Sequence, residues 1–476
     1  MSTPFTFGIE IELAVALLVE GQDNPDPSET RTQTDNPNDL SKSIRNGKFQ
    51  APTAVIYYRP RVQLKFIRVM EEAGFQVNPF DTSRQETTKW TVVGDISIHH
   101  PPQSPIPGES VETDEYSWIG VEIKSPALLM TQDSLDEVQK LCLLLPTHFK
   151  LITNSTCGLH VHVGHGQKGF TTSNVTRIIA FLYAFEPQLD TLHPLHRYNN
   201  AYAKSMRDRC NFVRQFQEQF SEEPTTLAVI TKILSLHKGK SPRHFRRALT
   251  RLVQIDGNGK NGAYNFNGVS DNPDRVPEDR PTIEFRQHEG TLDGVRIAAW
   301  IRALTGLLDF VESEDYDSLV DLLTTVSLAE KWTKRGDGKD TEREAEMGPA
   351  LADGPFTIIE LFQHCGMDHA ATYYGDKVYK HNIPPRRVFN DQNTGPYKWT
   401  CTSGFNRLSG EEKESYRNRR RHFYKLQVVK SAAKLAGDEW SFDEDDKDRW
   451  PEHQRKVDWD SGSGSGSGSG SSTTDD

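Results

Sequence analysis

Five short segments of this chain alternate apolar and polar residues with a period of two, and this alternation constrains the fold more than any other feature. In a β-strand, residues two apart point to the same side. Each segment therefore predicts a strand with one buried apolar face and one polar face. The segments are FGIEIEL (7–13), WTVVGDISI (90–98), WIGVEIKSP (118–126), GLHVHVG (158–164) and TIEFRQHEGTLD (282–293), and the strand of the last segment is expected at 282–286.

The polar faces carry mainly carboxylates, imidazoles and cations, which is unusual for a solvent-exposed strand face. In chain order they hold Glu10, Glu12, Asp95, Ser97, Glu122, Lys124, His160, His162, Glu284 and Arg286. Carboxylates gathered on one sheet repel each other, and divalent metals offset this repulsion. With one or two imidazoles they suit Mg²⁺ or Mn²⁺ bridging substrate phosphates, while Arg286 and Lys124 suit a phosphate or a developing negative charge. Glu10→Gln or Glu12→Gln is accordingly expected to stabilise the metal-free protein.

Other interpretations of these residues stay open at this point. Polar strand faces usually just meet water, and spacing alone does not show that the five strands are neighbours. The HxH spacing of His160 and His162 also occurs in zinc sites, and buried structural histidines are at least as common. Cys157 could be a nucleophile with a histidine base. A Walker A pattern is absent, and we expect neither a Rossmann nor a P-loop site.

The rest of the chain predicts mainly helices and connecting segments. Residues 20–58 are rich in Asp, Asn, Pro, Ser and Thr and predict a loop or insertion within a catalytic domain of residues 1–312. A helix at 313–332, a linker at 333–355, a small helical region at 356–440 and an acidic, SG-rich flexible tail at 441–476 follow. Helices of the first domain are predicted at 60–74, 133–149, 172–192, 224–236, 242–254 and 292–312, with Asp133 or Ser134 as the N-cap of the second.

Composition narrows the cellular setting and the partners. The net charge of −11 argues against a nucleic-acid-binding surface, which needs clustered Lys and Arg. Five cysteines without a CxxC pattern indicate a reducing compartment. The first apolar stretch contains Glu10 and Glu12, which makes it a poor signal peptide, and no apolar run approaches membrane-spanning length. We therefore expect a cytoplasmic protein with no nucleic-acid or membrane partner.

The motifs FGIEIE, WTVVGDISI, GVEIKSP, CGLHVHVG and TIEFRQHEGTLD, in this order, resemble the amidoligase family over about residues 5–312. That family is similar to glutamine synthetase and glutamate–cysteine ligase in its catalytic core. The resemblance implies an α+β fold with a curved, mainly antiparallel sheet and helices on its outer face. It also implies that metals, ATP and an amino-acid-like substrate bind the concave face.

The same resemblance implies a mechanism and roles for the motif residues. ATP phosphorylates a carboxylate to an acyl phosphate, and an amine then displaces phosphate to form an amide, with Mg²⁺ or Mn²⁺ bridging the ATP phosphates. The metal ligands implied by motif position are Glu10, Glu12, Glu122, His160 and Glu284. The catalytic candidates are Arg286, Lys124 and Asp95. The candidate nucleotide contacts are His162, Ser97, Arg197 and Lys204.

An ATP-dependent ligase for small-molecule or peptide carboxylates and amines is thus the first functional hypothesis. A small-molecule phosphotransferase on the same fold is the second, because it would use the same phosphate-binding chemistry. A non-catalytic protein that keeps a nucleotide or metal site is the third, and a zinc hydrolase is a weaker fourth. The sequence identifies neither the carboxylate nor the amine, and it does not indicate the oligomeric state.

Overall fold

The computed structural model describes residues 5–18, 23–31, 33–34, 51–80, 86–99, 116–166, 169–197, 200–236, 242–255, 260–270, 281–331 and 358–381. The expected linker, the acidic tail and most of the expected C-terminal helical region lie outside these residues. The chain forms two compact units. The first comprises residues 1–223, 240–313 and 356–401, and the second comprises 224–239, 314–355 and 402–476. In the second unit, helices α7 (Thr226–Ser235) and α10 (Tyr316–Lys331) pack against each other.

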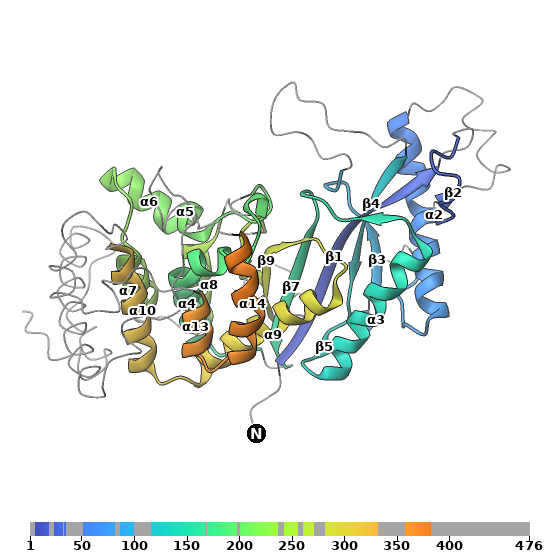
Figure 1. The fold of residues 1–476 in the computed structure, drawn as a ribbon. Helices are drawn as coiled ribbons and strands as arrows, with labels where there is room; N and C mark the ends of the chain where they lie inside the picture. The colour runs from blue at the N-terminus through green and yellow to red at the C-terminus, as the bar shows by residue number, and fades with distance from the viewer. Residues whose placement is uncertain are drawn as a thin grey trace, which may run out of the picture. The chain divides into compact units, whose positions relative to one another are not determined.

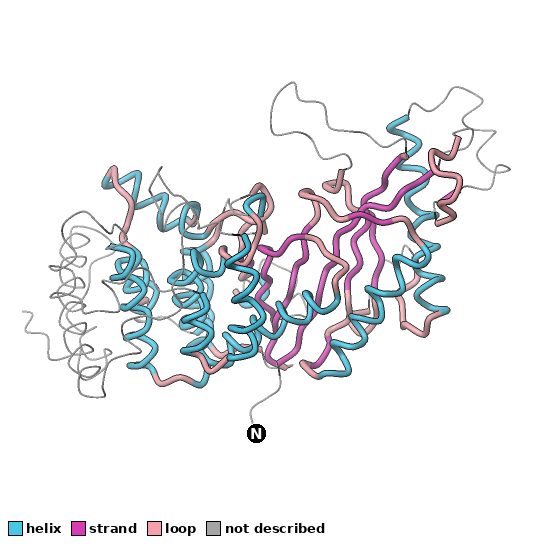
Figure 2. The backbone as a smooth tube through the Cα atoms, in the orientation of Figure 1, coloured by secondary structure: helices cyan, strands magenta, loops and turns pink. Residues whose placement is uncertain are grey.

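A nine-stranded sheet forms the centre of the first unit (Figures 1 and 2). Its main path runs β3–β4–β1–β7–β9–β8, and β2, β5 and β6 add short pairings to β1. All strand pairs are antiparallel except β1 with β2. The strands are β1 (Phe5–Leu18), β2 (Gln33–Thr34), β3 (Thr91–Gly94), β4 (Ser117–Lys124), β5 (Leu128–Leu129), β6 (Leu151–Ile152), β7 (Gly158–His165), β8 (Tyr264–Asn265) and β9 (Thr282–Glu289). The expected α+β class is confirmed, but the sheet is open and uncurled, not curved as the resemblance implied.

The central strand β1 changes character along its length. In its first half, Phe7, Ile9 and Ile11 are almost fully buried on one face, as the alternation predicts. Beyond Glu12 the sequence becomes continuously apolar, and both faces of the strand are buried there. A strand covered on both faces needs no polar residues. The polar face of β1 is therefore confined to its first half.

Helices cover one side of the sheet (Figure 1). The long helices α3 (Gln132–His148) and α9 (Gly294–Ser313) pack against each other, and α2 (Ala51–Glu72) packs on β3 and β4. Leu141 of α3 and Leu304 of α9 are buried with the apolar residues of β1, which places the core between the two layers. The remaining helices of this unit are α4 (Thr172–Asp190), η1 (Leu195–Arg197), α5 (Met206–Arg209), α6 (Asn211–Phe220), α8 (Pro242–Val253), η2 (Asn267–Val269), α13 (Ile358–His364) and α14 (Asp368–His381).

Four of the expected element boundaries were wrong. The helix expected at 60–74 begins at Ala51, within the segment 20–58 that was expected to be a loop or insertion. Thr131, and neither Asp133 nor Ser134, caps α3: its Oγ1 accepts a hydrogen bond from the Ser134 N–H at 3.3 Å. The strand expected over 90–98 ends at Gly94, because the Asp95 carboxylate accepts hydrogen bonds from Ser97 and forms a turn that competes with the β-ladder. The strand expected over 282–286 continues to Glu289.

Two helices, α5 and α6, were not expected at all. The signal for α6 is present in the sequence, since Phe212, Val213 and Phe216 are buried at helical spacing. No helix in the described part of the chain is long and apolar enough to cross a bilayer.

Gly120 of β4 gives a test of how tightly β3 and β4 pack. A Cβ at Gly120 would lie 2.2 Å from the Asp95 carbonyl oxygen and 2.7 Å from the Ile98 Cβ. Gly120→Ala should therefore destabilise the protein by about 1–3 kcal/mol, measured by chemical denaturation. Gly375→Ala on α14 is the control, because no atom lies within 4 Å of its Cβ, and it should be neutral or stabilising. Equal denaturation midpoints for Gly120→Ala and wild type would show that the turn moves away freely.

Candidate active site

All five strands that carry the alternating pattern are consecutive neighbours in the sheet. Their order is β3, β4, β1, β7 and β9. Residues directly opposite each other in an antiparallel pair project to the same face. The registers therefore gather most of the predicted polar residues into one cluster around β1.

Glu10 lies at the centre of this cluster. It is opposite Lys124 of β4 on one side and His160 of β7 on the other. Lys124 Nζ donates to Glu10 Oε1 at 2.9 Å, His160 Nδ1 lies 3.1 Å from Oε2, and His162 Nε2 lies 3.5 Å from Oε1. Burial alone would raise the pKa of Glu10. Hydrogen bonds from the two histidines and the charge of Lys124 outweigh burial and hold this pKa well below its ordinary value.

This environment changes the expectation for Glu10→Gln. The repulsion argument treated every carboxylate of the cluster as destabilising. The lowered pKa of Glu10 means instead that the fold favours its ionised form. Removing that charge takes away an attraction from Lys124 and the histidines, so we now expect Glu10→Gln to destabilise the metal-free protein.

Glu122 is the carboxylate whose ionised form the cluster stabilises least. Burial and the charge of Glu10 raise its pKa to about 8, although Lys124 Nζ lies only 3.0 Å from Glu122 Oε2. Its opposite neighbour on β1 is Glu12. Glu12 has better partners: it accepts the Gly158 N–H at 2.6 Å and lies 3.4 Å from His160 Nε2. The four glutamates of the cluster therefore differ sharply in their partners.

A β-bulge places Arg286 beside the cluster. Between Leu159 and Val161 of β7, the opposite residue on β9 changes from His288 to Phe285, so β9 contains one extra residue at Arg286. The Arg286 guanidinium donates to Glu284 Oε1 and, through Nε, to the Tyr202 carbonyl at 2.9 Å. Its Nη1 also lies 3.3 Å from His160 Nδ1. Burial would lower the pKa of Arg286, but the charge of Glu284 raises it above its ordinary value.

Arg197 stabilises this bulge through hydrogen bonds to the backbone. It is 3% exposed, and its Nη2 donates to the Arg286 carbonyl at 2.7 Å. Its Nη1 reaches the Cys157 carbonyl at 3.5 Å. Arg197 therefore lies beside the cluster, where its guanidinium donates hydrogen bonds to backbone carbonyl oxygens.

The donor atoms of the cluster fit divalent metal. One set consists of Glu10, His162 and Glu284, and a second of Glu10, Glu122 and His160; within each set the ligand atoms lie within 4.8 Å of one another. Glu10 belongs to both sets, as a carboxylate bridging two metals would. His162 Nε2 is buried and faces the Glu10 carboxylate at 3.5 Å, so both could be ligands of one cation. Carboxylate oxygens with imidazole nitrogens suit Mn²⁺ or Mg²⁺.

Other predicted residues make described contacts outside this cluster. Asp95 and Ser97 bond to each other in the turn after β3. The backbone of Lys204 pairs with Asn261 and Ala263. Cys157 is fully buried, and burial raises the pKa of its thiol to about 11, which gives no support to its role as a nucleophile.

Sequence reasoning missed two members of the site, Asn265 and Gly158. Asn265 Nδ2 donates to Glu284 Oε2 at 2.7 Å from the two-residue strand β8, which is too short to show an alternation. Gly158 supplies the N–H that Glu12 accepts. The ExE and HxH motifs draw attention to side chains, whereas this contact comes from backbone.

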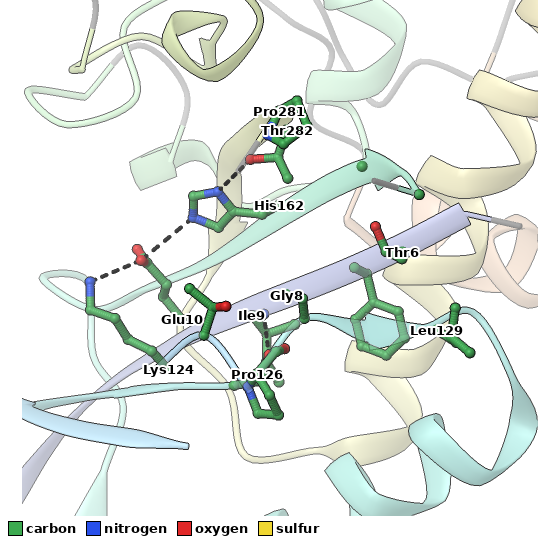
Figure 3. Close-up of a pocket in the computed structure, with 16 residues that line it drawn as sticks. Thr6, Gly8, Ile9, Glu10, Lys124, Pro126, Leu129, His162, Pro281 and Thr282 are labelled. Carbon is green, nitrogen blue, oxygen red and sulfur yellow. Dashed lines mark hydrogen bonds and ion pairs between the residues drawn. The ribbon is translucent and has the colours of Figure 1, made fainter. Parts of the chain in front are cut away.

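A pocket of about 500 Å³ opens beside the cluster (Figure 3). Glu10, Lys124 and His162 line one end of it, and Thr6 and Leu129 lie at the other. Pockets of this size hold small-molecule ligands. The cluster therefore has a place for a ligand next to its charged groups.

Comparison with known proteins decides the family. A family model described as "Putative amidoligase enzyme" matches residues 3–308. The chain belongs to this amidoligase family. The match covers the whole sheet and every residue of the cluster, so the amidoligase assignment rests on the part of the chain that forms the site. It indicates a ligase-type enzyme. No curated protein and no solved structure matches this amidoligase.

The raised pKa of Glu122 predicts a pH-dependent stability. In the unfolded chain Glu122 loses its proton near its ordinary pKa, but in the folded protein it keeps the proton up to a pKa of about 8. This difference progressively destabilises the wild type as pH rises between these two values. Glu122→Gln removes the effect, so the variant should gain stability over wild type from about pH 5 to pH 8 and keep a constant advantage above. Chemical denaturation in EDTA at several pH values measures it.

The control for this experiment is Glu72→Gln, because Glu72 is exposed on α2. It should follow the wild type at every pH. A Glu122→Gln advantage that does not change with pH would contradict the assignment of a buried, protonated Glu122.

Proposed function

We propose that this chain is an ATP- and divalent-metal-dependent carboxylate–amine ligase that acts through an acyl phosphate. One observation carries the proposal: Glu10 is shared by two sets of metal-binding atoms that lie between Lys124 and Arg286, within the region that matches the amidoligase family. Family membership supports ligase chemistry. The carboxylate and imidazole cluster supports metal-assisted handling of phosphate.

The proposal includes a glutamine synthetase-like core. An antiparallel sheet with helices on one side and the charged cluster on its polar face supports this relationship. Mg²⁺ or Mn²⁺ would be held by Glu10 with His162 and Glu284, and by Glu10 with Glu122 and His160, while Glu12 would support His160. When bound, such ions screen the phosphate charges and polarise the transferred phosphoryl group.

The reaction has two balanced steps. A substrate carboxylate oxygen attacks the γ-phosphorus of ATP, the bond to the bridging oxygen breaks, and ADP leaves. The amine nitrogen then attacks the acyl carbon, the bond to the phosphate oxygen breaks, and the nitrogen loses a proton. The product is an amide with inorganic phosphate. Each step gathers negative charge on oxygen, and preorganised cations are the usual means of stabilising it.

Two residues of the chain are suited to this task. Glu284 and the Tyr202 carbonyl hold the Arg286 guanidinium in one orientation, so its planar set of donors is preorganised for phosphoryl oxygens. Lys124 lies between Glu10 and Glu122, and their charges raise its pKa although burial would lower it. It stays protonated and adds a fixed positive charge. The catalytic role of Asp95 and the nucleotide contacts of Ser97 and Lys204 remain predictions.

The decisive experiment traps the acyl group with hydroxylamine. The purified protein is incubated with ATP, Mg²⁺, hydroxylamine and a panel of carboxylates, and both hydroxamate and phosphate are measured. A ligase forms hydroxamate in proportion to phosphate, and ¹⁸O from the labelled carboxylate appears in the phosphate. A stable phosphorylated product without hydroxamate would identify the phosphotransferase instead. ATP turnover that requires zinc and not magnesium would contradict the proposal.

Substitutions in the cluster separate metal binding from transition-state stabilisation. Glu10→Gln should abolish metal-dependent ATP turnover, because Glu10 is shared by both donor sets. Arg286→Ala should reduce kcat by about a hundredfold or more while changing ATP affinity less, as expected for a group that acts in the transition state. Steady-state kinetics and ATP-induced thermal shifts provide the measurements. Glu71→Gln, exposed on α2, is the matched control and should behave like wild type.

Metal affinity should also depend on pH. Glu122 must lose its proton to bind a cation, and its pKa is about 8 in the metal-free protein. Mn²⁺ should therefore bind more tightly as pH rises from about 6 to 8, with proton release that calorimetry in buffers of different ionisation enthalpy detects. In Glu122→Gln this proton release should be smaller, and the remainder would come from His162, whose pKa the charge of Glu284 raises although burial would lower it. Release that is unchanged in the variant would assign the proton to another group.

A further inference from the structure

The pocket beside the cluster has one charged end and one uncharged end. Glu10, Lys124 and His162 line the charged end. Every other described residue that lines the pocket is uncharged, among them the hydroxyl-bearing Thr6 and the apolar Leu129. Figure 3 shows the two ends separated along β1. A ligand that fills this pocket therefore meets charge only where it approaches the cluster.

A bare stretch of β1 joins the two ends. Thr6, Gly8 and Glu10 alternate along β1 on the polar face, so the missing side chain of Gly8 leaves the middle of the pocket open. A Cβ at Gly8 would lie 3.7 Å from Ser125 Oγ, 3.8 Å from the Pro126 carbonyl oxygen and 3.9 Å from the His162 Cβ. These are ordinary contact distances. Gly8 can therefore be replaced by alanine without strain, and the added methyl group would narrow the passage.

We infer that this pocket binds the tail of the carboxylate substrate, and that the substrate class is a carboxylate carried on a slender, uncharged chain. The inference rests on the proposed function, which places the reacting carboxylate at the cluster. A charged tail at the Thr6 and Leu129 end would lose part of its hydration against uncharged residues and find no opposite charge among the described lining residues, which disfavours it. Threonine hydroxyls and backbone groups can instead bond a neutral amide. Leu129 is 52% exposed, so a longer tail can leave the pocket there.

The charge at the cluster favours a carboxylate over an amine as the end that enters first. Lys124 and Glu10 line this end of the pocket and pair with each other, so the proposed cations would make the charge at this end positive. A substrate ammonium group would be repelled by these charges, whereas a carboxylate would be attracted. The amine substrate must then approach from outside the pocket.

Three carboxylates of similar length test the tail. Glutaramate has a neutral amide tail, glutarate an anionic one and 5-aminopentanoate a cationic one. In the hydroxylamine assay with ATP and Mg²⁺, glutaramate should show a kcat/KM at least about tenfold above the other two. Equal or better use of either charged tail would overturn the inference.

Two variants place the tail in this pocket. Gly8→Ala should lower kcat/KM for glutaramate about tenfold and leave the KM for ATP unchanged, because it narrows the pocket and meets the cluster only at an ordinary contact distance, 3.9 Å from the His162 Cβ. Leu129→Ala should shift the preference toward bulkier neutral tails. Leu143→Ala is the matched control, since Leu143 is a similarly exposed leucine on α3 and should leave all values unchanged. A wild-type profile in both Gly8→Ala and Leu129→Ala would overturn the placement.

A binding measurement separates this inference from the proposed function. If no carboxylate gives hydroxamate, the thermal shift caused by each of the three carboxylates in Mn²⁺ is measured for wild type and Gly8→Ala. A shift with glutaramate that Gly8→Ala abolishes supports the pocket even though the ligase proposal has failed. No shift with any of the three, or a shift that Gly8→Ala leaves intact, overturns the pocket assignment.

Discussion

The attraction between the Glu10 carboxylate and three surrounding groups is the interaction on which the site depends. Lys124, His160 and His162 reach this one side chain from the two strands that flank β1. Because β1 is the central strand, any shift of β4 or β7 by one residue would turn these partners to the opposite face. The register of the sheet and the composition of the site are thus the same constraint, and the buried apolar face of β1 helps to fix both.

The four glutamates of the cluster are each stabilised by different partners, and together these partners offset the negative charge. Glu10 is ionised by its partners, Glu12 is held by a backbone N–H, and Glu284 is bonded by Arg286 and Asn265. Glu122 keeps a proton, which lowers the repulsion in the metal-free protein. A bound cation would replace that proton. The metal-free cluster therefore has less repulsion between its carboxylates. When a cation binds, Glu122 can lose its proton and become a charged ligand.

The sequence predicts the faces of the strands well but not their partners. Alternation shows that Glu10 and Glu12 oppose Ile9 and Ile11, because it follows directly from strand geometry. It carries no information on which strand lies next to which, and only the observed register places Lys124 and His160 beside Glu10. The pattern also misleads at Asp95, where alternation continues but a side-chain hydrogen bond to Ser97 ends the strand. The bulge at Arg286 and the role of Asn265 come from long-range pairing, which local patterns do not encode.

Gly158 and Gly8 lie at the two ends of the charged part of the cluster. The space around Gly158 is filled by side chains, whereas the space around Gly8 is open. Around Gly158, an added Cβ would lie 2.8 Å from the Arg197 guanidinium, 3.0 Å from His160 and 3.2 Å from Glu12, so this end is filled by the protein itself. Around Gly8, the nearest atoms lie 3.7 Å or more from such a Cβ, and the pocket occupies the space. One end of the polar face is thus closed by side chains that position the cluster, and the other is open. A ligand in this pocket lies on the Gly8 side of the polar face of β1, and it reaches Glu10 before it reaches Glu12.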